Sequence, residues 1–296
     1  MKTKMASAPR QEDPRAESRK RFLRAMFSRK IVVVATVIVV LFILAAGLAP
    51  ALSPYDPNAA DLYDISSPPT AKHLLGTDAS GRDVLSRLLY GSRISITIGL
   101  VAVSIACVIG TFLGMCAAYF GGIADTVIMR TMEALRSVPS VILAMALVTI
   151  YGGGFRNVAI ILGVSTVPGY VMMMRAQVLS VKSTDYVTAA RLQGNSSLRL
   201  MLRHILPNCV SPLIVMMTQQ VGSTILSEAG LSFIGVGISV PTASWGTMVS
   251  QGKDVLLQNP LLALLPGLCV ALLVICLNTM GDGIRDALDP RLRGEI

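Results

Sequence analysis

The chain has 296 residues, of which 53% are hydrophobic and only 15% are charged. Its mean hydropathy of +0.64 excludes a soluble domain of this length, so we predict an integral membrane protein. The net charge of +9 does not indicate nucleic-acid binding, because no basic patch is interleaved with aromatic residues. We attribute this charge to membrane topology and to attraction by anionic lipid.

The first segment, residues 1–30, is polar and basic, and we expect it to be mostly disordered near the inner-leaflet headgroups. The apolar run 31–52 follows. Its core is longer than the hydrophobic region of a signal peptide, and no clean cleavage site comes after it. We interpret it as an uncleaved first transmembrane helix.

Residues 53–93 form the predicted loop between the first two spans. Its first part is rich in Pro, Asp and Ser and reads as an extended surface loop. From Arg82 onward apolar residues recur at helical spacing, which predicts a short amphipathic helix at the membrane face. These apolar residues are Val84, Leu85, Leu88 and Leu89.

Five more apolar runs are predicted to cross the membrane, which makes six spans in an all-α polytopic membrane protein. The 138–151 run is short, about 21 Å of helix, so it must borrow length from the amphipathic stretch Asp125–Ser137 or tilt less than its neighbours. The runs are 94–119, 138–151, 158–174, 205–226 and 261–280. The five cysteines lie within such runs, which favours packing over disulfide or metal roles: Cys107, Cys116, Cys209, Cys269 and Cys276.

Most of the 26 Lys and Arg residues fall in segments that this topology places on one side. The positive-inside bias therefore makes both termini cytoplasmic and makes loop 53–93 extracytoplasmic. The cytoplasmic segments are residues 1–30, 120–137, 175–204 and 281–296.

The most informative cytoplasmic segment is the polar, basic loop 175–204. We predict a short helix in it that Asp185 or Thr188 caps and that Gly194 ends, because glycine tolerates the positive φ of a helix stop. A second helix starts at Ser196 or Ser197. The predicted packing face of the first helix consists of Tyr186, Ala189 and Ala190.

This loop resembles the cytoplasmic loop of permease subunits in bacterial ATP-binding-cassette (ABC) importers. The matching residues are Thr188-Ala189-Ala190, Gly194 and Leu206-Pro207, with Thr188 in place of the family's glutamate and His204 in place of its isoleucine. Three further motifs resemble the second, C-type permease subunit of dipeptide, oligopeptide and nickel importers. They are Leu75-Gly76-Thr77-Asp78 with Gly81-Arg82-Asp83, Glu228–Gly237 with Trp245-Gly246, and Gly281–Arg291.

The resemblance implies a type I ABC importer permease fold, with residues 94–281 as the transmembrane domain and 282–296 as a cytoplasmic tail. It implies a subunit of the bacterial inner membrane that forms the path for peptides, or for a related solute such as a nickel chelate. The implied partners are a homologous second permease subunit, two ATPase subunits and an extracytoplasmic solute-binding protein. ATP would be hydrolysed on the partners, so we expect this chain to bind no cofactor and to be no enzyme.

Two residues near the end of the fifth span are weaker candidates. Glu228 is expected either to line the translocation path or to pair with an arginine, and Phe233 is a candidate path or gate residue. The alternatives are a stand-alone channel or an intramembrane enzyme. An enzyme needs a catalytic pair within the spans, and the sequence has neither a phosphate-binding loop nor a metalloprotease or hydrolase motif. The near absence of ionisable residues in the spans also disfavours a self-contained ion-coupled carrier.

Overall fold

The computed structural model describes residues 23–288, which are helical apart from connecting loops. The predicted N-terminal tail, up to residue 22, and the last residues of the C-terminal motif, from Asp289, lie outside this range. Within it, only an isolated bridge between Thr77 and Asp83 has strand-type pairing. The helices are α2 (Lys30–Gly47), α3 (Ala49–Leu52), α4 (Val84–Phe120), α5 (Gly122–Arg136), α6 (Ser140–Tyr151), α7 (Phe155–Lys182), α8 (Asp185–Leu192), α9 (Ser197–Arg199), the π-helix η1 (Leu200–Ile205), α10 (Leu206–Ile234), α11 (Trp245–Lys253) and α12 (Leu261–Leu288).

Five described helices are long and apolar enough to cross a membrane: α2, α4, α7, the stretch Ser197–Ile234 and α12. A sixth span exists only if α5 and α6 are counted together, and these two are bent by 86° relative to each other. The short run 138–151 therefore forms a separate helix, α6, which follows the amphipathic helix α5 after a sharp bend of the chain. Pro139 lies at this bend as the N-cap of α6, where a residue without an N–H cannot continue the preceding helix.

The predicted amphipathic helix after Arg82 is not a separate element at the membrane face. It forms the first turns of α4, one uninterrupted helix of 37 residues. The side chain of Asp83 caps this helix by accepting a hydrogen bond from the backbone N–H of Ser86. The first turns are buried, with Val84 1% and Arg87 1% exposed, because loop 53–83 and α11 cover them.

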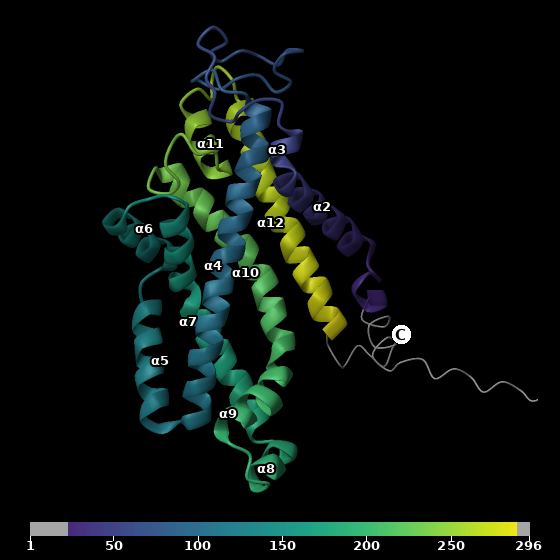
Figure 1. Ribbon diagram of the computed structural model, residues 1–296, viewed down its shortest axis with the longest axis vertical. Coiled ribbons are helices and arrows are strands. Elements are labelled where there is room, and N and C mark those ends of the chain that lie inside the picture. Colours follow the sequence, from purple (N-terminus) through teal and green to yellow (C-terminus); the bar gives the residue numbers. More distant parts are fainter. Residues whose placement is uncertain (1–22, 289–296) are drawn as a thin grey trace, which may run out of the picture.

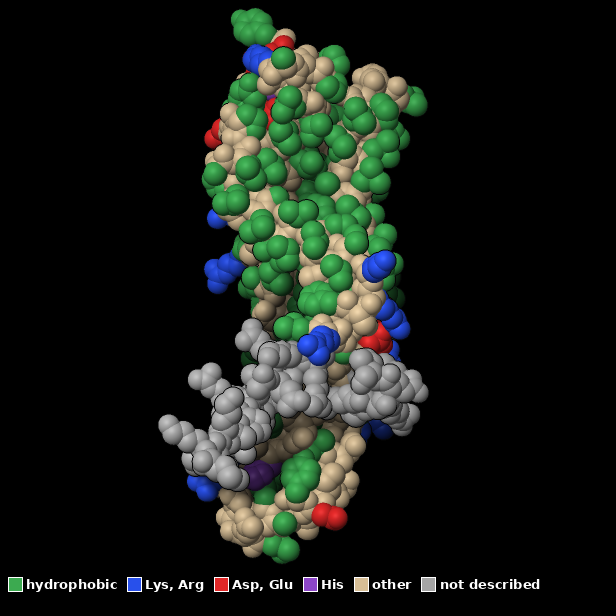
Figure 2. Space-filling model, turned by 90° about the vertical axis from the view of Figure 1, so that its right-hand side faces the viewer, with side chains coloured by type: hydrophobic (Ala, Val, Ile, Leu, Met, Phe, Trp, Pro, Cys, Tyr) green, Lys and Arg blue, Asp and Glu red, His purple; other side chains and the backbone are tan. Residues whose placement is uncertain are grey.

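The helices pack side by side along the long axis of the molecule (Figure 1). α4 packs closely along α7, since Gly110 and Gly114 let it approach the backbone of Tyr170 and Val171. α10 contacts both α4 and α12, and α12 contacts α2. Figure 2 shows hydrophobic side chains over most of one long face, which is the surface expected to meet lipid.

The long axis ends in two regions that lie beyond the apolar helices (Figure 1). We call residues 53–83 together with α11 the cap. At the opposite end, residues 183–205 carry α8, α9 and η1, and we call this segment the tip. These two ends hold most of the polar chemistry described below.

Candidate functional site

α8 forms in the tip where the sequence predicted a short helix, but its N-cap is Thr184 rather than Asp185 or Thr188. The Thr184 backbone is extended, at φ −78° and ψ 149°, and its hydroxyl donates to the carbonyl of Val181 at 2.6 Å. Asp185 is instead the first helical residue and Arg191 lies in the last turn. Both charges are thus on the favourable ends of the helix dipole.

Gly194 ends the first helix of the tip with positive φ, as predicted from the sequence. Its φ is 78°, and its N–H donates to the carbonyl of Arg191 at 3.0 Å. The side-chain amide of Asn195 donates to the carbonyl of Ala190 at 2.8 Å and so satisfies one of the free carbonyls at the helix end. No heavy atom lies within 4 Å of where a Cβ of residue 194 would be, so the backbone conformation alone requires glycine there.

The second helix of the tip begins at Ser197, in agreement with the sequence. It does not continue regularly, because the π-helix η1 follows, in which the N–H of Leu206 donates to the carbonyl of Met201 five residues earlier. Leu206 and Pro207 then form the first turn of α10, a position where the missing N–H of proline costs no helical hydrogen bond. The sequence did not predict the π-helix, an element often found at functional sites.

The inner face of α8 differs from the predicted packing face. Ala190 is buried, but its partner on that face is Val187, which is only 4% exposed. Tyr186 and Ala189 point outward. An eight-residue helix carries apolar residues on more than one side. Which side packs inward depends on contacts with other helices. The cluster in which Val187 packs consists of Met115, Ala118, Met174, Val178, Val187, Met201, Ile205 and Cys209.

The outward surface of the tip carries large apolar side chains among polar and basic ones. Leu192 is 85% exposed, Leu198 62%, Leu202 50% and Tyr186 46%. Several such residues close together on one short segment make the tip a candidate contact surface. Sequence reasoning missed these leucines, although their presence in an otherwise polar and basic loop was a usable signal. Thr188 is also exposed, and its hydroxyl donates to the carbonyl of Thr184 at 3.2 Å.

The tip is firmly attached to the helices above it. At the last residue of α7, the ammonium of Lys182 donates to the carbonyls of Ala118 at 3.2 Å and Tyr119 at 2.6 Å, near the end of α4. A few turns away, the Arg175 guanidinium binds both carboxylate oxygens of Asp125 at 2.6 Å. These contacts hold the end of α7, from which the tip continues, against α4 and α5.

Glu228 is buried in this structure, with its side chain 0% exposed. Among the described residues it pairs with hydroxyl groups and not with an arginine. The carboxylate accepts from the hydroxyls of Ser95 at 2.8 Å and Ser232 at 2.9 Å, which ties α10 to α4. Phe233 is 41% exposed, and the Lys253 ammonium lies 4.8 Å from its ring centre.

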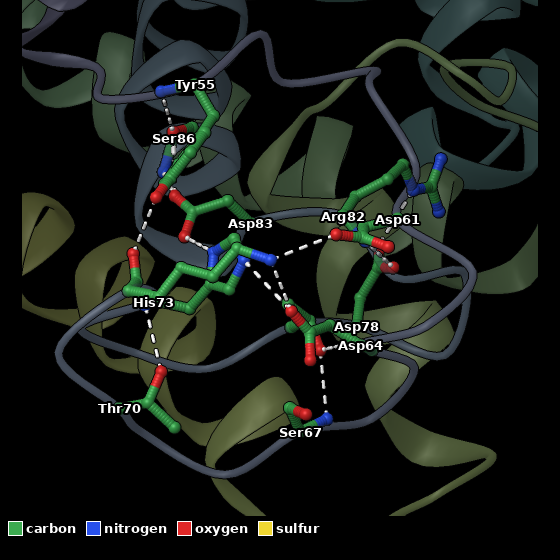
Figure 3. A network of polar contacts seen from close by, with 12 residues as sticks. Tyr55, Asp61, Asp64, Ser67, Thr70, His73, Asp78, Arg82, Asp83 and Ser86 are labelled. Carbon is green, nitrogen blue, oxygen red and sulfur yellow. Dashed lines mark hydrogen bonds and ion pairs between the residues drawn. The ribbon is translucent and has the colours of Figure 1, made fainter.

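The cap contains the most extensive polar network of the described residues (Figure 3). His73 is almost fully buried, and its Nδ1 lies 2.8 Å from the Asp83 carboxylate, which also accepts the hydroxyl of Ser86 at 2.7 Å. Asp78 accepts from Nε of Arg82 at 2.8 Å. The motif residues that carry the family resemblance in this segment thus fold the cap onto the start of α4.

Arg87 joins the cap to the rest of the chain. Its guanidinium lies 3.4 Å from Asp78, and it donates to the carbonyl of Pro57 at 3.1 Å and to the side-chain oxygen of Gln251 in α11 at 3.3 Å. At the cap surface, the Lys72 ammonium lies between the carboxylates of Asp61 at 3.0 Å and Asp64 at 2.6 Å. These hydrogen bonds raise the pKa of Lys72 and lower the pKa of Asp61.

These arrangements suit binding and motion rather than bond-making. No group of three or more His, Cys, Asp and Glu side chains within residues 23–288 is placed to hold a metal ion. The tip exposes several large apolar side chains, and the cap covers the start of α4 with a network of polar contacts.

Long apolar helices with a short helix held beyond them are the arrangement expected of a transport permease. The chain belongs to the binding-protein-dependent transport system inner membrane component family, whose model matches residues 110–294. A second model, the N-terminal TM domain of oligopeptide transport permease C, matches residues 19–69. The family resemblance drawn from the motifs is thereby confirmed, and the chain is a transport permease rather than an enzyme.

Similar proteins include the di/tripeptide transport system permease protein DppC of Pseudomonas aeruginosa, which is 43% identical over 86% of each chain. The probable D,D-dipeptide transport system permease protein DdpC of Escherichia coli is 43% identical over 89% of this chain and 88% of its own. The glutathione transport system permease protein GsiD of another Escherichia coli strain is 37% identical over 92% and 90%.

Among solved structures, an inward-facing MetNI methionine ABC transporter matches 69% of this chain and 98% of its own, with a TM-score of 0.56 at 17% identity. A crystal structure of an amino acid ABC transporter with histidines matches 68% and 94%, with a TM-score of 0.53. The shared fold is the type I ABC importer permease fold predicted from the sequence.

Proposed function

We propose that this chain forms one half of the translocation path of an ATP-driven importer for peptides. Its relatives are named for di/tripeptides, D,D-dipeptides and glutathione, and all of these are small peptides. The other half of the path would come from a homologous second permease subunit. An extracytoplasmic binding protein would deliver the peptide, and two ATPase subunits would bind and hydrolyse the ATP, so this chain itself needs no cofactor.

The observation that carries this proposal is the set of large apolar side chains that the tip exposes, with Leu192 the most exposed of its leucines. A short helix whose inner side is fixed by Val187 and Ala190 and whose outer side presents Leu192 is suited to sit in a cleft of an ATPase. Movement of that cleft would pass through Lys182 and η1 into α7 and α10. Ala190 takes part by packing inward, and Ala189 is the alanine that the ATPase would approach.

In this proposal the membrane is the bacterial inner membrane, the tip lies in the cytoplasm and the cap lies outside. The concentration of Lys and Arg in residues 175–204 supports this orientation, since basic loops stay on the cytoplasmic side. Cysteines placed at Lys72 and at Ser197 test it. A membrane-impermeant thiol reagent should label the first in intact cells and spare the second.

The coupling role is tested by Leu192→Glu, which places a charge at the centre of the proposed contact. We expect the ATPase subunits to stop co-purifying with the permease, and peptide uptake to be lost, while the second permease subunit stays bound. Leu62→Glu is the matched control, because Leu62 is 75% exposed in the cap at the other end of the molecule. If Leu192→Glu retains the ATPases as well as Leu62→Glu does, the tip is not the coupling element.

A further inference from the structure

A set of uncharged polar side chains and one carboxylate lies where α10 and α12 adjoin. Its α10 members lie well inside that helix, and the carboxylate, Asp282, lies six residues before the end of α12. Gln219 of α10 donates through Nε2 to the carboxylate of Asp282 in α12 at 3.1 Å. Gly222 faces Asn278 of α12. We call this set the polar seam, and its members are Gln219, Ser223, Ser227, Asn278 and Asp282.

The polar seam is accessible on the surface of this chain. Ser223, Asn278 and Asp282 are exposed, and Gln219 and Ser227 are half-buried. The opposite side of α10 is buried and holds Ile225. Ser227 lies about 31 Å along α10 from its first residue, and Gln219 about 20 Å, at 1.5 Å per residue. The seam therefore spans the middle of the helix rather than a headgroup region.

Lipid is an unfavourable neighbour for this surface. An exposed amide such as that of Asn278 carries a large desolvation cost in hydrocarbon, so such groups face water or protein in membrane helices. A useful comparison is Ser104 of α4, an exposed serine whose hydroxyl donates to the carbonyl of Leu100 at 2.7 Å, just as the Ser227 hydroxyl donates to the carbonyl of Ser223 at 2.9 Å. The two sites differ in their surroundings, because exposed Val101 and Val108 flank Ser104, whereas Ser223 lies beside Gly222, which faces Asn278.

We propose that the polar seam lines the water-filled path and contacts the peptide during its passage, an inference that rests on the proposed function. Hydroxyl groups both donate and accept hydrogen bonds and rotate freely, so they fit peptide groups of either direction. The relatives' di/tripeptides, D,D-dipeptides and glutathione differ in side chains and even in chirality, but all carry amide groups. The hydroxyl and amide groups along the seam match the amide groups that these solutes share.

Uptake into proteoliposomes that contain the complete transporter, ATP and binding protein gives the first test. Ser223→Leu and Ser227→Leu should each lower tripeptide uptake about tenfold, equivalent to 1.4 kcal/mol in the passage step. Stimulated ATP hydrolysis and co-purification of the second permease subunit should stay unchanged. Ser104→Leu, the matched control, should keep normal uptake. Loss of the second permease subunit in the seam variants would show a subunit interface instead and would overturn the proposal.

Thiol labelling gives a test that does not depend on the substrate. In a chain whose five native cysteines are replaced by alanine, Ser223→Cys should react with a membrane-impermeant thiol reagent and Ser104→Cys should not. Absence of labelling at residue 223 overturns the seam, whatever the transporter carries. If the unmodified transporter imports no peptide but residue 223 is labelled, the proposed substrate is wrong and the water-filled seam stands.

Discussion

The cap and the tip lie at opposite ends of the same helices, and their polar groups are used differently. In the cap, Arg87 contacts Gln251, a residue 164 positions away in sequence, and its buried charges are met within the chain. In the tip, hydrogen bonds are local, and Leu192 and Leu198 are left uncovered. The cap is therefore held to α4 by its own long-range contacts, although Leu62 and Tyr63 on its surface are also exposed. The tip is shaped mainly by local contacts, and in our proposal its exposed leucines meet the ATPase.

The largest effect is expected when the buried charge of Arg87, the α4 residue that holds the cap, is removed. Arg87→Met should lower the stability of the purified permease by about 3–5 kcal/mol, because Asp78 and the Pro57 carbonyl lose a buried partner. Thermal unfolding in detergent measures this. Lys72→Met is the control, since the Lys72 ion pairs are exposed and contribute little. An equal loss of stability in the two variants would contradict the expected difference between the buried Arg87 contacts and the exposed Lys72 ion pairs.

A second change acts on the tip without touching its packing. Gly194→Val should strain the backbone by roughly 1 kcal/mol or more, because a branched residue at φ 78° is disfavoured. We expect binding-protein-stimulated ATP hydrolysis and uptake to fall strongly, with normal membrane insertion. Gly194→Ala should have a smaller effect, and Gln193→Ala, an exposed neighbour, very little. Normal hydrolysis in Gly194→Val would contradict a coupling role for this turn.

A smaller effect is expected at the end of α8. Asn195→Ala removes the hydrogen bond to the Ala190 carbonyl and should cost about 1 kcal/mol locally. Hydrogen exchange at the end of α8 should become faster, while the cap remains unchanged. Asn208→Ala is the matched control, because its amide also donates to a backbone carbonyl, that of His204, but away from the end of α8. Identical exchange in both variants would show that Asn195 does not hold the turn.

The smallest expected effect is the pH response of the cap surface. Lys72 lowers the pKa of Asp61, so this contribution to stability is present above the unfolded-state pKa of about 4 and is lost as pH falls through the lower folded-state value. Limited proteolysis of loop 53–70 should therefore become faster only under acid conditions. Lys72→Met should show the faster cleavage already at neutral pH, and an unchanged profile would contradict the role of this pair.

Sequence patterns predicted the apolar helices and the stop at Gly194, because hydrophobic runs and a positive φ are local properties. They did not predict which side of α8 packs inward, since that choice depends on Met174 and Cys209 from other helices. The same limit applies to Glu228. Its position in the sequence suggested a path, but its partner Ser95 lies 133 residues away and buries it.

The cap itself was beyond sequence reasoning for a related reason. The spacing of Val84 and Leu88 correctly indicated a helix, yet an amphipathic pattern cannot tell a membrane surface from a covering loop. Only the pairing of Arg87 with Asp78 and Gln251 separates the two. The π-helix η1 also carries no compositional mark apart from the nearby Pro207.

The uninterrupted helix α4 gives the molecule a mechanical property. Its 37 residues make a rod of about 55 Å that starts under the cap and ends beside the Lys182 contact of the tip. A rod without a break transmits displacement with little loss, so its two ends cannot shift independently. Binding at one end of α4 would thus tilt the whole helix and move its other end. A flexible insertion in the middle of α4 would uncouple the two ends.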